Sequence, residues 1–173
     1  MKTFLKFAFV ALACLAAIPA LAAEKVKVDK LVVKTLPAQV YGQLQKGKDL
    51  SLVWKGPDFE GGRTFKIGGI SWKAPERLGE VLPYLKAQLP EVASANGFYT
   101  LDLVVTDAKP SKTSWLGHTT HGFYVMEGAV KDQSGKLVAA FVTKEETSAV
   151  GFDETAKPGL DKTISGIVGE LFK

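Results

Sequence analysis

Apolar and polar residues alternate from residue 99 to residue 106, which is typical of a half-buried β-strand. The apolar members of this pattern are Tyr99, Leu101, Leu103 and Val105. Two further segments, 123–131 and 136–147, flank Asp132-Gln133-Ser134-Gly135. Because Asp often starts a turn and Gly tolerates a positive φ, this tetrapeptide predicts the loop of a β-hairpin.

The region before residue 74 predicts three more strands. The first covers residues 26–33, the second covers 50–54, and the third covers 64–72, where Gly68-Gly69 loosens the pattern. Turn-forming segments separate the three strands. We expect these strands to form a meander, in which each strand pairs with the next.

Apolar residues between 74 and 95 recur at steps of three and four, which places them on one face of a helix. These residues are Leu78, Val81, Leu82, Leu85, Leu89 and Val92. Pro75 suits the first turn of such a helix, whereas Pro83 and Pro90 predict a kink or a break. Asn96 and Gly97 predict its end, because both tolerate the left-handed conformation common at helix termini.

A second apolar stripe of helical period follows Pro158 and predicts a C-terminal helix. Its residues are Leu160, Ile164, Ile167, Val168, Leu171 and Phe172. Long strands with only two helices predict an α+β fold, in which an antiparallel β-sheet has two amphipathic helices packed on one face. Residues 24–173 have the length of one ordinary domain and can bury a core without disulfides or metal.

Residues 1–23 have the features of a cleavable secretory signal peptide. Two lysines precede an apolar stretch from residue 7 to 18, and Ala20-Leu21-Ala22 has the A-x-A form of a cleavage site. We expect cleavage near Ala22 or Ala23 and export to the bacterial periplasm. The apolar stretch is shorter than the ~20 residues that a membrane-spanning helix needs. We therefore expect no transmembrane span in the mature chain.

Cys14 is the only cysteine and leaves an alternative open, an outer-membrane lipoprotein acylated at this residue. The position three residues before it holds Ala11, where lipoprotein signals usually have leucine. Acylation would also leave an apolar segment, residues 15–23, at the start of the mature chain in place of a polar tether. We favour cleavage near Ala22, which yields a mature chain without cysteine and so excludes disulfides and thiol catalysis.

The charge of the mature chain is close to neutral. The full sequence has 22 Lys+Arg against 18 Asp+Glu, a net charge of +4. Removing Lys2 and Lys6 leaves 20 against 18, a net charge of +2. Charges of both signs are interspersed and no basic stripe is present, so we expect no binding to nucleic acid.

The two histidines, His118 and His121, lie close together between residues 115 and 122. Two imidazoles three residues apart can share a metal ion if the backbone turns, but they point to opposite faces of an extended strand. No carboxylate lies within five residues of either histidine, so a metal site would need distant ligands. We favour surface histidines and keep a metal site as the alternative.

Several acidic residues fall on predicted strands. Glu127 shares a face with Phe123 and Val125, and we interpret it as a solvent-facing or edge residue that can pair with a lysine across the hairpin. Asp102 has the same interpretation. The pair Glu145-Glu146 is expected at a solvated strand end.

The three tryptophans, Trp54, Trp72 and Trp115, fall near predicted loops and are candidates for contact with a partner or ligand. Packing in the core or at its rim is the alternative that we favour. We find no nucleophile elbow, phosphate-binding loop, dinucleotide fingerprint or zinc-protease motif in the sequence, so it predicts neither a catalytic residue nor a cofactor.

The segment from Gly122 to Thr143 (GFYVMEGAVKDQSGKLVAAFVT) resembles a recurring hairpin of uncharacterised bacterial envelope proteins, many of them lipoproteins. In that group a Gly leads into a Met-Glu strand, an Asp-x-x-Gly turn and a strand with paired alanines. The resemblance implies a small α+β module in the envelope and carries over no catalytic residue.

These observations predict a non-enzymatic periplasmic protein that binds another envelope component, either a protein or a glycan. The alternative function is a periplasmic small-ligand or metal-binding protein that uses His118 and His121. A hydrolase ranks third.

Overall fold

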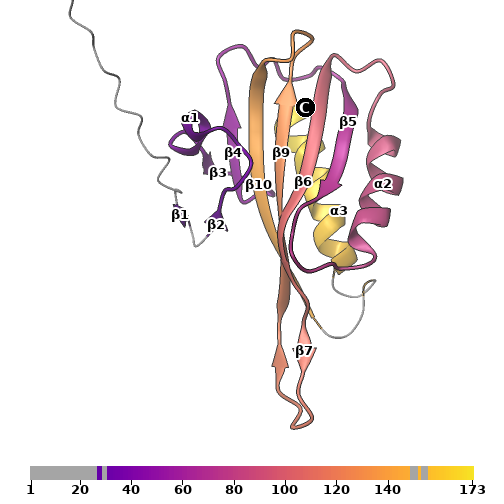
Figure 1. Ribbon diagram of the computed structural model, residues 1–173. Coiled ribbons are helices and arrows are strands. Elements are labelled where there is room, and N and C mark those ends of the chain that lie inside the picture. The colour runs from indigo at the N-terminus through magenta and orange to yellow at the C-terminus, as the bar shows by residue number, and fades with distance from the viewer. Residues whose placement is uncertain (1–26, 29–30, 149–151, 153–155) are drawn as a thin grey trace, which may run out of the picture.

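The computed structural model describes residues 27–28, 31–148, 152 and 156–173. The predicted signal peptide and Cys14 lie outside these residues. A mostly antiparallel six-stranded β-sheet forms the centre, in the order β3-β4-β10-β9-β6-β5 (Figure 1). These strands are β3 (Gln45–Lys46), β4 (Leu52–Lys55), β10 (Leu137–Thr147), β9 (Gly122–Lys131), β6 (Tyr99–Lys109) and β5 (Phe65–Trp72). The structure confirms the predicted α+β class.

The order of the strands shows that the predicted N-terminal meander is wrong. β4 pairs with β10 near one edge of the sheet, whereas β5 forms the opposite edge and pairs with β6 in parallel. The helix α2 (Val81–Val92) connects β5 to β6, and such a crossover is what a parallel pair requires. The predicted loosening at Gly68-Gly69 is confirmed, because the β5–β6 register shifts between Ile67 and Gly69.

The hairpin formed by β9 and β10 is confirmed. The amide of Gly135 donates to the carbonyl of Asp132 at 3.0 Å, and the amide of Asp132 donates to the carbonyl of Lys136 at 3.0 Å. The Asp132 carboxylate also accepts from the amide of Ser134 at 2.8 Å. Gly135 has a φ of +85°, as the turn prediction requires.

Helix α2 begins later than the apolar pattern predicts, at Val81, so Pro75 lies outside it. The late start places Pro83 in the first turn, where its missing N–H costs nothing, and Pro90 falls in the last turn. At Pro83 the predicted break is therefore a helix start, whereas Pro90 lies inside the helix, which continues to Val92 without a break. Val92 was expected on the buried face, but it is 43 % exposed.

Gly97 has a different role from the one that its sequence position suggests. It does not adopt a positive φ, which the structure assigns to Gly62, Gly117 and Gly135. A Cβ atom at Gly97 would lie 2.0 Å from the carbonyl carbon of Phe65. Gly97 is therefore needed because the backbone passes close to β5.

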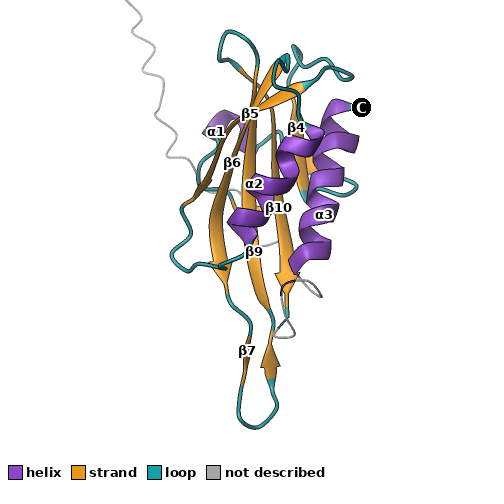
Figure 2. Cartoon of the chain, turned by 90° about the vertical axis from the view of Figure 1, so that its right-hand side faces the viewer, coloured by secondary structure: helices purple, strands orange, loops and turns teal. Residues whose placement is uncertain are grey.

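Helices α2 and α3 (Lys157–Gly166) cover one face of the sheet, as predicted (Figures 1 and 2). The chain continues from α3 into η2 (Ile167–Phe172), a π-helical segment. The ring of Phe172 stacks on that of Phe65 with centroids 4.2 Å apart. The buried sheet residues under the helices include Leu101, Leu103, Tyr124, Met126 and Phe141.

The opposite face is covered by the segment from residue 31 to 44, which we call the N-terminal strap. It contains β2 (Leu31–Val32), which pairs with β1 (Lys27–Val28), and the short helix α1 (Ala38–Tyr41). Strap residues Leu31, Val33 and Val40 join one buried cluster with Val125 and Val142 of the sheet. The predicted opening strand thus forms a small separate two-stranded sheet and part of a cover instead of a strand of the central sheet.

Candidate functional site: a projecting hairpin

The chain between β6 and β9 extends beyond the body of the protein as a narrow hairpin (Figures 1 and 2). We call residues 110–121 the arm. It contains β7 (Lys112–Thr113) and β8 (Thr119–Thr120), which pair antiparallel. Every residue from 112 to 121 is exposed. The arm is therefore held by its own pairing and by the two long strands that lead into it.

The tip of the arm is a tight turn that two backbone hydrogen bonds close. The amide of Ser114 donates to the carbonyl of His118 at 2.9 Å, and the amide of Gly117 donates to the carbonyl of Ser114 at 2.9 Å. Gly117 has a φ of +79°, which suits the last loop position of a three-residue hairpin turn. Trp115 and Leu116 occupy the two positions between the bonded residues and form the apex.

Both apex side chains are directed into solvent. Trp115 is 92 % exposed and Leu116 is 63 % exposed. In the part of the chain that the structure describes, Val92 is the other large apolar residue classed as exposed. Turn positions favour Gly, Asn, Asp, Ser and Pro, so turn formation does not explain a tryptophan and a leucine at this apex. Their exposure makes the apex the candidate contact site of this chain.

The arm carries positive charge. Lys112 lies on it and Lys109 ends β6 at its base, and the sequence has no aspartate or glutamate from residue 108 to 126. Asp107, at the base of the arm, forms an ion pair with Lys34 of the strap at 3.1 Å. The exposed apolar apex is therefore preceded by two lysines on the strand that leads to it.

His118 and His121 also lie on the arm, one on each side of β8, and both are exposed. Residues three apart in extended backbone point to opposite sides, which does not favour a shared metal ion. Within the described ranges, no group of three or more His, Cys, Asp or Glu residues could hold a metal ion. Metal binding by the two histidines stays an untested alternative.

The other two tryptophans are half-buried and hydrogen-bonded. The indole nitrogen of Trp54 donates to the Gln43 side chain at 2.9 Å, and that of Trp72 donates to the Ala74 carbonyl at 3.1 Å. Their rings pack at the rims of the two buried clusters. Of the three candidate tryptophans, Trp115 alone presents its whole ring to solvent.

The interpretation of Glu127 as solvent-facing is wrong, because its side chain is 1 % exposed. Its carboxylate accepts hydrogen bonds from the backbone amides of Lys34, Thr35 and Leu36 in the strap. Alternation placed it correctly on the face of Phe123 and Val125, but the strap covers that face. The sequence carried one sign of this role, a carboxylate between apolar residues of a strand.

The remaining acidic residues are placed nearer to expectation. Asp102 forms an ion pair with Lys131 across the β6–β9 pair at 2.8 Å. Glu146 is exposed, as predicted. Glu145 is half-buried, and this burial raises the pKa of its carboxyl group.

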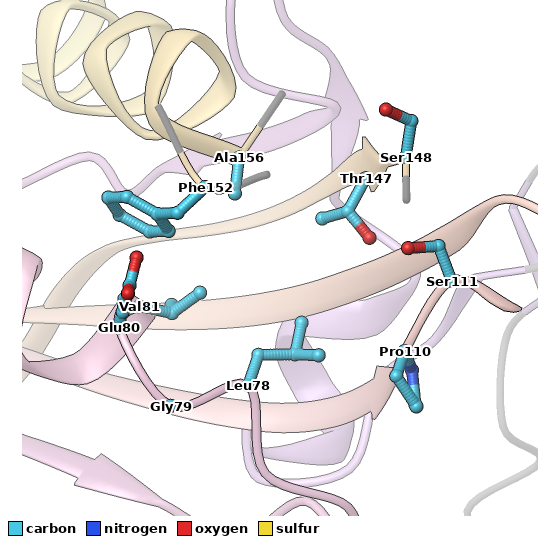
Figure 3. A pocket seen from close by; sticks show the side chains of 10 residues that line it. All are labelled: Leu78, Gly79, Glu80, Val81, Pro110, Ser111, Thr147, Ser148, Phe152 and Ala156. Atoms are coloured by element: carbon cyan, nitrogen blue, oxygen red, sulfur yellow. The ribbon is translucent and has the colours of Figure 1, made fainter. Parts of the chain in front are cut away.

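A pocket of about 420 Å³ opens between the start of α2, the base of the arm and the start of α3 (Figure 3). Phe152 lies on one side of it and the hydroxyl groups of Ser111 and Thr147 lie on the other. The Thr147 hydroxyl is buried and has no hydrogen-bond partner among the described residues. This pocket was not anticipated from the sequence, because it is lined by residues from four separate elements.

No protein-family model matches the chain, and no curated protein matches its sequence. Among solved structures, the chain is similar to a minor lipoprotein from Acinetobacter baumannii, with 13 % sequence identity. That similarity covers 59 % of this chain and 84 % of the other, with a TM-score of 0.25. A likeness of this size supports no inference about function.

No helix in the described portion of the chain has both the length and the apolar character needed to cross a membrane.

Proposed function

We propose that this protein is an exported, non-enzymatic binding module of the bacterial cell envelope, and that the arm is its contact element. One observation carries the proposal: Trp115 and Leu116 are exposed together at the apex of a projecting, internally hydrogen-bonded hairpin. Tryptophan is enriched among the residues that dominate binding energy at interfaces. Because the turn is already formed, binding through it does not require the backbone to be ordered first.

The rest of the protein serves as a support for the arm. The two faces of the sheet are covered, one by α2 and α3 and the other by the strap. The strands β6 and β9, which lead into the arm, lie in the interior of the sheet order. This arrangement fixes the base of the arm while leaving its tip accessible.

The envelope location is part of the proposal and rests on the sequence. Residues 1–23 have the three regions of a secretory signal, and no catalytic motif was found in the chain. A periplasmic mature protein agrees with these features, and acylation at Cys14 is the alternative route to the same compartment.

Binding of the purified protein to washed envelope fragments tests the proposal. The double variant Trp115→Ala/Leu116→Ser removes the apolar apex and should weaken co-sedimentation at least about tenfold, since burying each side chain contributes about 2 kcal/mol. Val92→Ser changes an exposed apolar residue on α2 and is the matched control, expected to bind like the wild type. Equal binding by the apex variant and the wild type would overturn the proposal.

A further inference from the structure

We infer that the tip of the arm enters the headgroup layer of an anionic lipid bilayer. This inference rests on the proposed function and names the component that the arm contacts. Three features support it: the hydrogen bonds within the tip, the apolar residues at its apex, and the lysines on the strand that leads to the apex.

Several of the polar groups at the tip are paired within the arm. Besides the two backbone bonds of the turn, the amide of His118 donates to the Ser114 hydroxyl at 3.2 Å. The hydroxyl groups of Thr113 and Thr119 lie 3.2 Å apart and share a hydrogen bond. Water is scarce in the hydrocarbon below the headgroups. A segment that reaches this hydrocarbon must therefore pair its polar groups internally. The hydrogen bonds of the tip meet that requirement for the groups that flank the apex, before any binding.

The two apex residues suit the boundary between headgroups and hydrocarbon. Tryptophan is enriched at this boundary, since its ring is apolar and its indole N–H finds a partner at the headgroup level. Leucine is favoured in the hydrocarbon next to it. As neighbours at the apex of a narrow turn, Trp115 and Leu116 can be buried together without moving the sheet.

The charge along the arm is complementary to anionic lipid. Lys109 and Lys112 follow the apex toward the body, and no carboxylate interrupts residues 108–126. Lysines near an anionic surface are attracted to it, and salt weakens the attraction. With the apolar apex inserted toward the hydrocarbon, the lysines behind it would lie at the level of the anionic headgroups.

The size of the tip favours a bilayer over a folded partner protein. A specific protein interface buries about 800 Å² on each partner, usually as a packed patch of many residues. The tip provides two adjacent apolar side chains on a hairpin only two strands wide. A fluid headgroup layer conforms around so narrow an element, so no complementary surface is needed.

Vesicle co-sedimentation of the exported form tests the inference. Vesicles of phosphatidylglycerol and phosphatidylcholine should bind the wild-type protein at low salt, and vesicles of phosphatidylcholine alone should bind it more weakly. Trp115→Ala/Leu116→Ser should lower the affinity at least about tenfold. Lys109→Gln/Lys112→Gln should lower it about tenfold and reduce its salt dependence. Val92→Ser is expected to bind like the wild type.

A fluorescence measurement separates insertion from loose adsorption. In a Trp54→Phe/Trp72→Phe variant, Trp115 is the remaining tryptophan. Its emission should shift to shorter wavelength on vesicles that contain phosphatidylglycerol, and lipids brominated on the acyl chain should quench it. An unchanged emission would overturn insertion of the tip.

The lipid inference and the proposed function can fail separately. Tip-dependent binding to envelope fragments without binding to vesicles would overturn the inference and identify a protein or glycan as the partner, leaving the proposed function intact. Equal binding to both kinds of vesicle would overturn the preference for anionic lipid. Loss of tip dependence on fragments and vesicles alike would overturn both.

Discussion

At the scale of single residues, Glu127 decides where the N-terminal strap lies. Its carboxylate accepts from the amide of Lys34 at 2.6 Å, from the amide and hydroxyl of Thr35 at 2.7 and 2.6 Å, and from the amide of Leu36 at 3.1 Å. A buried carboxylate is costly unless hydrogen bonds compensate for lost water. Here the four donors provide that compensation, and one of them, the amide of Leu36, is itself buried.

Replacing this carboxylate should release the strap. In Glu127→Gln the amide group offers one acceptor oxygen and turns an NH₂ group toward donors, so we expect the free energy of unfolding to fall by about 2–4 kcal/mol. Urea denaturation measures the change. Asp102→Asn removes a carboxylate from a half-exposed ion pair and should cost about 1 kcal/mol or less. Similar losses in the two variants would contradict the assigned role of Glu127.

At the scale of elements, the helical face depends on a contact between the C-terminus and the loop before β4. Glu170 of η2 accepts hydrogen bonds from the backbone amides of Asp49 and Leu50, the second at 2.8 Å. Burial by itself would raise the pKa of Glu170, but the amides of Asp49, Leu50 and Lys48 outweigh it and lower the pKa below the ordinary value of 4.5. The ionised carboxylate therefore ties the last helical segment to this loop.

This contact should make stability depend on pH. Because the pKa of Glu170 is lower in the folded chain than in the unfolded chain, its contribution is present above pH 4.5 and is lost as the pH falls through the lowered pKa. Glu170→Gln should lose about 1–3 kcal/mol of unfolding free energy at pH 7. The difference from the wild type should shrink toward zero in acid.

Urea denaturation at a series of pH values measures this difference. Glu146→Gln alters an exposed carboxylate at the end of β10 and serves as the control, with little change expected at pH 7. If the difference in unfolding free energy between wild type and Glu170→Gln stayed constant down to pH 3, the ionisation of Glu170 would not contribute to stability, which would contradict this prediction.

At the scale of the whole molecule, the arm is the part that projects beyond the sheet and its two covering layers. The helices and the strap bury apolar side chains on the two faces of the sheet, while Trp115 and Leu116 remain exposed. Burying a large apolar side chain is favourable, and the proposed function gives these two a partner surface that would cover them.

The processing of the N-terminus on export, by cleavage or by acylation, concerns the whole chain. Intact mass spectrometry of the exported protein should give a chain that begins at Ala23 or Glu24 and contains no cysteine. A diacylglyceryl mass increment on a chain that begins at Cys14 would contradict this and place the arm on a lipid-tethered protein.

Local patterns were sufficient for the elements whose neighbours lie nearby in the chain. Alternation located β6, and Asp132 and Gly135 located the β9–β10 turn, because a hairpin is specified by adjacent residues. The apolar stripe located the C-terminal helix, whose buried residues include Leu160, Ile164 and Leu171. These predictions needed only the period of each element and the chemistry of its turns.

Contacts between distant residues had to come from the tertiary structure. Alternation placed Glu127 on a face of the sheet, but only the fold showed that the strap, more than ninety positions earlier, covers that face. The same holds for β5, whose sequence predicts a strand but not a parallel partner across α2. The periodicity of apolar residues indicates the face on which a side chain lies, but not which segment of the chain packs against that face.

The sequence by itself determined the α+β class, the central hairpin, the two amphipathic helices and the prediction of export, because each follows from local periodicity or from an N-terminal segment with its own signature. Only the tertiary structure decided the strand order, the cover over Glu127 and the isolation of Trp115. The last distinction separates three tryptophans that looked alike in sequence: two are held at the rims of the buried clusters, and one is left at the tip of the arm. Exposure depends on everything that packs around a residue, so it is a property of the fold and not of the residue's neighbours in the chain.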